Sequence, residues 1–185
     1  MLKKNVRRNF KKIFIFKFAP QIFACAARGD LGGKMIRKGV LKTNIHPCTR
    51  YDYEGCESKP CLEMMKNLEA FVGCADSVGK EYTALGKTYT ISACDNFSYV
   101  DPVDGSSAVK QGIRIMFTDG SRLVFRLSGT GSSGATVRMY VDSYEKDPAK
   151  LFGSAQEMLG PCVEVGLVIS QLRELTGRTQ PTVIT

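Results

Sequence analysis

Residues 126–138 carry the residue types that could bind a phosphate group. The segment reads Arg126-Leu-Ser-Gly-Thr-Gly-Ser-Ser-Gly-Ala-Thr-Val-Arg138, with glycines and hydroxyl side chains between two arginines. A glycine-rich backbone can turn several N–H groups inward as a nest of donors, and arginines contact oxyanions bidentately. The composition suits a flexible Gly/Ser hairpin loop about equally well. Since no Lys-Ser/Thr pair follows the glycines, the segment is not a nucleotide-binding P-loop.

The residues on both sides of this segment predict the strands that must position it. Leu123, Phe125 and Leu127 alternate with polar or smaller residues on the N-terminal side, and Val137 and Met139 do so on the C-terminal side. Apolar residues at every second position are typical of half-buried strands. The pattern predicts strands over 121–127 and 135–143 joined by the glycine-rich loop.

Further strands and two helices are predicted around this unit. Asp119-Gly120 is a two-residue hairpin signal that joins residues 121–127 to a strand over 112–118. Shorter strands are expected over 82–85 and 88–92, while residues 96–100 either extend the sheet or form a loop. One helix is expected over 58–71 with Ser58 as its cap, and another over 153–176 ended by Gly177. The result is an α+β fold, a small antiparallel sheet with helices packed on one face.

Basic charge is concentrated in the first 47 residues. They hold 12 of the 26 lysines and arginines but one of the 18 acidic residues, so residues 48–185 have a small negative charge. The basic character therefore does not indicate nucleic-acid binding by the whole chain. Residues 1–47 form an unassigned basic leader, for which a secretory signal, a mitochondrial presequence, a membrane-surface anchor and a leader without a defined fold are the alternatives. The apolar run is too short and too interrupted to span a bilayer.

The seven cysteines and the single histidine favour neither a disulfide framework nor a zinc site. The cysteines are odd in number, irregularly spaced and contain no C-x-x-C pair. Cys162 lies on the apolar stripe of the second predicted helix, where a free thiol acts as a small hydrophobic group. We therefore expect reduced thiols and a cytoplasmic protein. With His46 as the only histidine, no Ser/His/Asp or Cys/His catalytic arrangement can be assembled.

Residues from about 49 to 185 resemble the C-terminal domain of phosphoglucomutases, in the alpha-D-phosphohexomutase family. The resemblance rests on the runs Arg50-Tyr-Asp-Tyr-Glu, Met64-Met-Lys-Asn-Leu-Glu-Ala, Asp101-Pro-Val-Asp-Gly-Ser, Phe117-Thr-Asp-Gly-Ser-Arg, residues 122–147 and the ending Thr176-Gly-Arg-Thr-Gln-Pro-Thr-Val-Ile-Thr185. It implies that residues 48–185 are a phosphate-binding domain with a TATA-binding-protein-like α+β fold. It also implies that the glycine-rich loop holds the phosphate of the sugar that is not being transferred, through Arg126, Ser128, Gly129, Thr130, Gly131, Ser132 and Arg138.

The same resemblance implies machinery that this sequence does not contain. The family transfers a phosphoryl group through a phosphoserine, with Mg²⁺ held by three aspartates and a separate loop that reads the sugar. None of the three motifs occurs in these 185 residues. We therefore expect no catalytic residue, no metal site and no turnover by this chain alone. The expected partners are the phosphosugars glucose 1-phosphate, glucose 6-phosphate and glucose 1,6-bisphosphate, together with the missing phosphohexomutase domains. Nucleic acid and membrane are not expected partners.

Two functions are compatible with this resemblance. In the first, the chain is the phosphate-clamping domain of a phosphoglucomutase, as a fragment, an incomplete gene product or a short isoform. In the second, it is a non-catalytic binding or cytoskeletal interaction module related to the mutases. The glycine-rich loop is the part in which such non-catalytic relatives depart from the pattern, and here it is unbroken. The loop therefore favours the first function.

Overall fold

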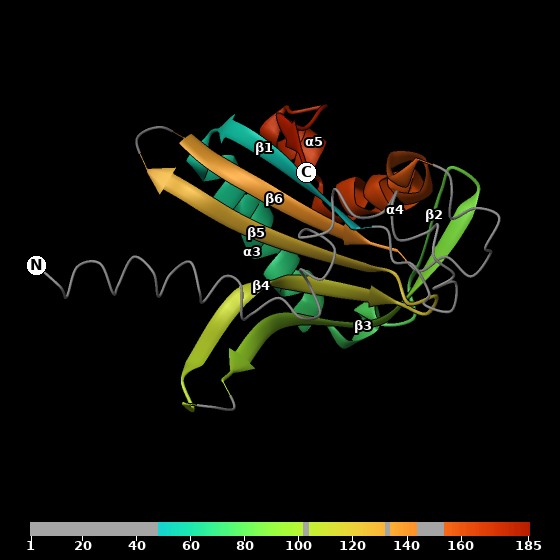
Figure 1. Cartoon of the computed structure of the whole chain (residues 1–185), viewed down its shortest axis with the longest axis horizontal. Helices are drawn as coiled ribbons and strands as arrows, with labels where there is room; N and C mark the ends of the chain where they lie inside the picture. The colour runs from blue at the N-terminus through green and yellow to red at the C-terminus, as the bar shows by residue number, and fades with distance from the viewer. Residues whose placement is uncertain (1–47, 102–103, 132–133, 144–153) are drawn as a thin grey trace, which may run out of the picture. The chain divides into compact units, whose positions relative to one another are not determined.

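The computed structural model describes residues 48–101, 104–131, 134–143 and 154–185, so the predicted leader lies outside the described residues. The described residues form a strongly curved antiparallel sheet and helices (Figure 1). The strands are β1 (Cys48–Cys56), β2 (Glu81–Ala84), β3 (Lys87–Val100), β4 (Ser107–Phe117), β5 (Arg122–Gly131), β6 (Gly134–Asp142) and β7 (Val183–Ile184). The helices are α3 (Ser58–Gly73), the single-turn η3 (Ala75–Ser77), α4 (Ala155–Ser170) and α5 (Leu172–Thr176).

The strands are arranged in the order β2-β3-β4-β5-β6-β1-β7. Strands β2 to β6 follow one another as antiparallel neighbours, as expected for hairpin connections. Strand β1 pairs with β6 on one side and with the C-terminal β7 on the other, so both ends of the described fold meet at this edge. The α+β architecture with an antiparallel sheet is thus confirmed.

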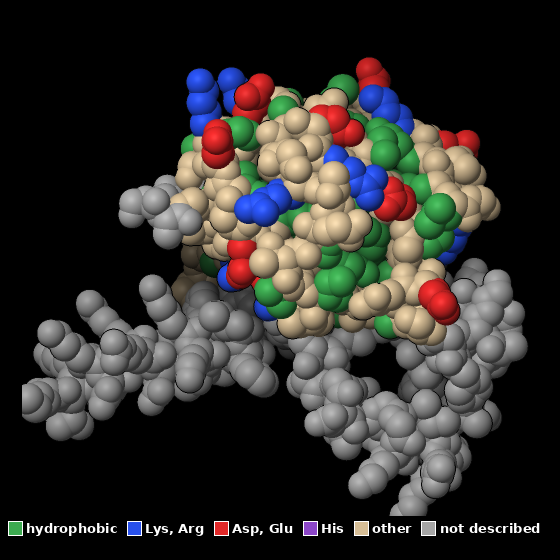
Figure 2. Space-filling view, turned by 90° about the horizontal axis from the view of Figure 1, so that it is seen from above, with side chains coloured by type: hydrophobic (Ala, Val, Ile, Leu, Met, Phe, Trp, Pro, Cys, Tyr) green, Lys and Arg blue, Asp and Glu red, His purple; other side chains and the backbone are tan. Residues whose placement is uncertain are grey.

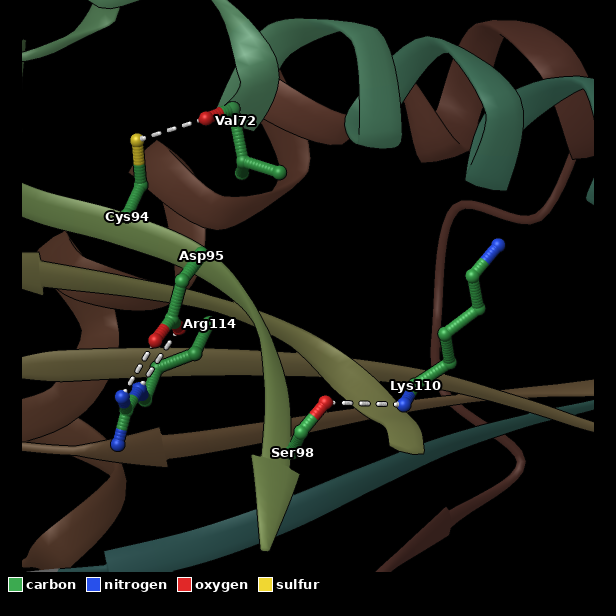
Figure 3. A network of polar contacts seen from close by, with 6 residues as sticks. All are labelled: Val72, Cys94, Asp95, Ser98, Lys110 and Arg114. Carbon is green, nitrogen blue, oxygen red and sulfur yellow. Dashed lines mark hydrogen bonds and ion pairs between the residues drawn. The ribbon is translucent and has the colours of Figure 1, made fainter. Parts of the chain in front are cut away.

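The two faces of the sheet differ in character because successive side chains of a strand point to opposite faces. On β6, Ala135, Val137, Met139 and Val141 are fully buried, while the residues between them are partly exposed. Figure 3 shows the same alternation on β3: the Cys94 thiol points toward α3, where it approaches the Val72 carbonyl oxygen at 3.8 Å. We call the side that carries α3 and α4 the core face and the opposite side the open face.

The core lies between the core face and the two long helices. Helix α3 contributes Cys61, Met64 and Leu68, and α4 contributes Leu159, Cys162 and Val165, all of them buried. Burial raises the pKa of the Cys162 thiol to about 12, so this thiol is neutral at physiological pH. The prediction that Cys162 acts as a small hydrophobic group agrees with this environment. The six described cysteines are free thiols.

Several strands are longer than the sequence pattern predicts. The Asp119-Gly120 turn is confirmed, because Gly120 donates its N–H to the Phe117 carbonyl between β4 and β5. Residues 96–100 extend the sheet as the end of β3, and β4 begins at Ser107 rather than at residue 112. Bulges between Ile91 and Ala93 and between Phe97 and Tyr99 interrupt the two-residue period in β3. These irregularities explain why alternation alone predicted shorter strands.

The helix ends also differ in detail from the prediction. Ser58 is the first residue of α3 rather than its cap; Glu57 occupies the cap position without a side-chain hydrogen bond. The predicted C-terminal helix is two helices, because Gln171 adopts a left-handed conformation with φ of 52° between α4 and α5. Gly160-Pro161 lies inside α4, and Gly177 ends α5 as predicted.

The surface shows no segregation of charge on the face seen in Figure 2, where basic and acidic side chains are interspersed. Within the described residues, no helix has the length and apolarity needed to cross a membrane. The interspersed charges agree with the small negative net charge of residues 48–185.

Leu159→Ala should lower the free energy of unfolding by about 2–5 kcal/mol, because it leaves a cavity where α4 packs on the sheet. Leu62→Ala on α3 is the matched control, since the Leu62 side chain is 53% exposed and its loss should cost less than about 1 kcal/mol. Urea denaturation of both variants measures the difference. Equal losses would contradict the assignment of Leu159 to the core.

Candidate phosphate-binding site

The two arginines of the glycine-rich segment lie directly opposite each other on the open face. Arg126 of β5 pairs in register with Arg138 of β6. Their neighbours Phe125 and Val137 are buried on the core face, which places both guanidinium groups on the other side of the sheet. Two positive charges on adjacent strands repel each other, and a pair of this kind is destabilising unless an anion offsets it.

The segment between them forms the end of a hairpin rather than a long loop. Strand β5 continues to Gly131 and β6 begins at Gly134, with Gly131 and Gly134 paired. Ser128 lies opposite Thr136, and the register shifts between Ser128 and Gly131, where Gly129 has φ of 68°. Gly129, Thr130 and Gly131 therefore lie in the irregular end of β5. Ser132, also predicted to bind phosphate, lies outside the described residues.

Gly134 fixes the base of this hairpin end against β1. Its φ is 93°, and a Cβ atom placed there would lie 3.1 Å from the Cys56 carbonyl oxygen. The adjacent part of β1 contains an irregularity between Tyr53 and Cys56. The Arg178 guanidinium, which follows α5, donates a hydrogen bond to the Gly55 carbonyl oxygen at 3.0 Å. The C-terminal segment thus stabilises the backbone against which the hairpin end rests.

Most arginines of the open face already have a carboxylate partner. Arg114 makes a bidentate contact with Asp95 at 2.9 and 2.6 Å (Figure 3). Arg122 contacts Asp142 at 2.6 Å. Among the residues that the structure describes, Arg126 has no ion-pair or hydrogen-bond partner for its side chain, and that side chain is exposed. Arg126 is therefore not paired with any described carboxylate and can contact an anion from solution.

Asp52 of β1 is a charged residue of this region that the sequence analysis did not assign. It pairs in register with Arg138, and its carboxylate lies 3.7 Å from the Arg138 Nε and 3.0 Å from the Arg50 Nε. The sequence signal was present, because Asp52 lies in the Arg50-Tyr-Asp-Tyr-Glu run. Its neighbour on the adjacent strand could not be read from that run alone.

The described residues contain no group of three or more His, Cys, Asp or Glu side chains that could hold a metal ion. Asp52, Asp95 and Asp142 of the open face are instead in contact with arginines. The chemistry that this arrangement offers is the binding of an anion by guanidinium groups and, at the hairpin end, by hydroxyl and backbone donors.

Comparison with known proteins shows the family to which the chain belongs. A family model described as "Phosphoglucomutase-1, C-terminal domain" matches residues 46–182. The chain is 58% identical over 137 residues to phosphoglucomutase-1 of Homo sapiens, which covers 74% of this chain and 24% of the human protein. It is 43% identical over 160 residues to phosphoglucomutase-like protein 5 of Mus musculus, covering 86% of this chain and 28% of that protein.

A solved structure shares the fold. It is an open-form crystal structure of the exocytosis-sensitive phosphoprotein pp63/parafusin, a phosphoglucomutase from Paramecium. The TM-score is 0.61 at 38% identity, and the match covers 76% of this chain and 23% of the Paramecium chain. The chain spans about a quarter of the length of the relatives that it matches.

Gly134→Ala should destabilise the fold by about 1–3 kcal/mol, because it combines a positive φ with a close contact to the Cys56 carbonyl oxygen. Gly79→Ala is the matched control: Gly79 has φ of 85°, but a Cβ atom added there would have no other atom within 4 Å. The excess loss of thermal stability in Gly134→Ala over Gly79→Ala measures the contact with β1. Identical melting temperatures would show that β1 does not constrain the hairpin end.

Proposed function

Because this chain belongs to the phosphoglucomutase family and matches its C-terminal domain, we propose that its open face clamps the phosphate of a phosphosugar. The clamp consists of Arg126 and Arg138 at its mouth, with the hairpin end between them. The proposed ligands are glucose 1-phosphate, glucose 6-phosphate and glucose 1,6-bisphosphate. Within a complete mutase, the clamp would hold the non-transferred phosphate during intramolecular phosphoryl transfer.

The observation that carries this proposal is the direct pairing of Arg126 with Arg138 on the open face, with Arg126 lacking a carboxylate partner among the described residues. Two neighbouring guanidinium groups match the geometry and charge of a phosphate group. A bound phosphate would also offset the repulsion between them. The remaining proposed contacts are Ser128, Gly129, Thr130, Gly131 and Ser132, which follow from the family resemblance.

The proposed role is binding rather than catalysis by this chain alone. The family mechanism requires a phosphoserine and a metal-binding loop, and the sequence contains neither motif. The described residues offer no set of ligands for Mg²⁺. The cytoplasmic location remains a prediction. The non-catalytic interaction role remains the alternative function, and the binding experiment below distinguishes it from the clamp.

Arg126→Ala should weaken the binding of glucose 1-phosphate by the full chain ten- to a hundredfold. A charge-assisted hydrogen bond contributes about 1.5–3 kcal/mol, which corresponds to a change of this size. Isothermal titration calorimetry measures both affinities. We expect wild-type dissociation constants of roughly high micromolar to millimolar, because an open sheet face buries little of a small ligand.

Arg173→Ala is the control variant. Arg173 of α5 forms a bidentate ion pair with Glu164 at 2.8 Å and does not belong to the open face. Its replacement should leave the affinity unchanged. If wild-type protein fails to bind, or if both variants bind alike, the clamp proposal is wrong and an interaction module becomes the better explanation.

A further inference from the structure

A single row of residues crosses four strands of the open face at the proposed clamp. Arg126 of β5, Arg138 of β6 and Asp52 of β1 follow one another in register, and Gly112 of β4 lies next to Arg126. The Arg126 side chain lies close to β4: a Cβ atom placed on Gly112 would lie 3.0 Å from the Arg126 Cγ. The row therefore places two positive charges side by side, with one negative charge next to the second.

Asp52 is the most deeply buried charged group in this row. Its side chain is 4% exposed, compared with 40% for Arg138 and 32% for Arg50. A buried carboxylate is costly unless cations offset its charge. Here the Asp52 carboxylate lies between the guanidinium group of Arg50, on the same strand, and that of Arg138, on the adjacent strand β6. Arg50 and Arg138 together compensate Asp52, and Asp52 in turn offsets the repulsion between Arg138 and Arg126.

The backbone around Asp52 is held from the opposite side by the C-terminal segment. Thr182 donates its N–H to the Asp52 carbonyl oxygen at 2.7 Å, and its hydroxyl accepts the Glu54 N–H at 3.1 Å. Arg50 and Thr185 exchange backbone hydrogen bonds at 2.7 and 3.0 Å. The backbone at Asp52 is therefore held in place, so the Asp52 side chain can position the Arg138 side chain.

The contact with Arg138 involves the inner edge of its guanidinium group. The Arg138 Nε lies 3.7 Å from an Asp52 carboxylate oxygen, so the Nε side of the guanidinium group faces Asp52. The Nε atoms of Arg50 and Arg138 and the Asp52 Oδ1 are buried and lack well-aligned hydrogen bonds within the described residues. The 3.0 and 3.7 Å separations are thus ion-pair distances, so the attraction is mainly between charges.

We propose that Asp52 is a positioning residue for the phosphate clamp: it holds Arg138 by its Nε edge, beside Arg126, so that the outer edge of the guanidinium group faces the ligand. This inference rests on the proposed function, because it assigns a role relative to that same site. Asp52 does not touch the phosphate in this proposal. It acts through the orientation of Arg138 and through the charge that allows two arginines to stand side by side.

Removal of the Asp52 charge distinguishes two effects of this residue on phosphate affinity: the positioning of Arg138 and the electrostatic field of the open face. Asp52→Asn makes the open face more positive by one unit, and a longer-range field alone would then attract a phosphate more strongly. Loss of positioning has the opposite effect, since Arg138 would no longer be held in its binding orientation. The sign of the change in affinity therefore distinguishes the two explanations.

The experiment is calorimetric titration of full-length wild type, Asp52→Asn, Asp52→Glu and Asp142→Asn with glucose 1-phosphate, with circular dichroism as a check of folding. We expect about tenfold weaker binding for Asp52→Asn, which corresponds to the loss of about one charge-assisted hydrogen bond between Arg138 and the phosphate. Asp52→Glu keeps the charge and should recover part of the affinity. Asp142→Asn is the matched control, because it also removes one open-face carboxylate but lies four residues along β6, roughly 13 Å from Arg138.

Each outcome decides the proposal. Weaker binding by folded Asp52→Asn, with Asp142→Asn unchanged or tighter, supports positioning by Asp52. Unchanged or tighter binding by Asp52→Asn overturns it, and so does an equal loss of affinity in both Asn variants, while loss of binding in Arg126→Ala would leave the clamp proposal itself intact. Absence of wild-type binding overturns the clamp and the positioning role together. If Asp52→Asn does not fold, Asp52→Glu replaces it: weaker binding with a shifted Arg138 Nε–H signal in NMR spectra supports the proposal, whereas wild-type affinity despite a shifted signal overturns it.

Discussion

The register of the antiparallel sheet is the constraint on which the other features depend. Burial of Phe125, Val137 and Met139 under the helices fixes which residues face the core, and the alternation then places Arg126 and Arg138 on the open face. A shift of one residue in either strand would exchange the two sets. It would bury arginines without partners and expose apolar side chains, at a cost of several kcal/mol for each buried charge. The apolar core thus determines the position of the charged site without touching it.

The open face then distributes its charges according to strand pairing. Arg114 is held by Asp95 and also lies 4.8 Å from the centre of the Phe97 ring. Arg122 is held by Asp142. At the glycine-rich end the pattern changes, because a buried Asp52 is shared by two arginines and Arg126 is left exposed. Pairing stabilises the fold where the sheet is continuous, whereas the Arg126 charge, which has no ion-pair partner among the described residues, lies where the hairpin ends.

The local elements of this fold could be predicted from the sequence, while the long-range pairings could not. The Asp119-Gly120 turn and the alternation around Phe125 and Val137 are local signals, and both were correctly interpreted. Strand β1 was not predicted, although charged residues alternate with Tyr51 and Tyr53 over residues 50–54. The break at Gln171 has no local signal of the kind that glycine or proline provides.

The same difference between local and long-range information applies to the candidate site. Arg126, Arg138 and the glycines between them were selected from one contiguous segment, so their relation could be read from spacing and resemblance. The role of Asp52 depends on a pairing between residues 52 and 138, which are far apart in the chain. Such a pairing follows from the position of β1 between β6 and β7. A charged residue inside a strand can therefore be assigned only once its neighbours on both adjacent strands are known.

A phosphate clamp on an open sheet face has a physical consequence for affinity. The exposed Arg126 is surrounded by water and counterions, which weaken its attraction for a phosphate over distances beyond about 8–10 Å. A surface that covers the ligand would exclude water and strengthen the same contacts without changing a residue. The chain spans about a quarter of its relatives' length. Weak binding by the open face alone is therefore compatible with strong binding in a closed, full-length protein, because the dielectric environment rather than the set of donors would differ between them.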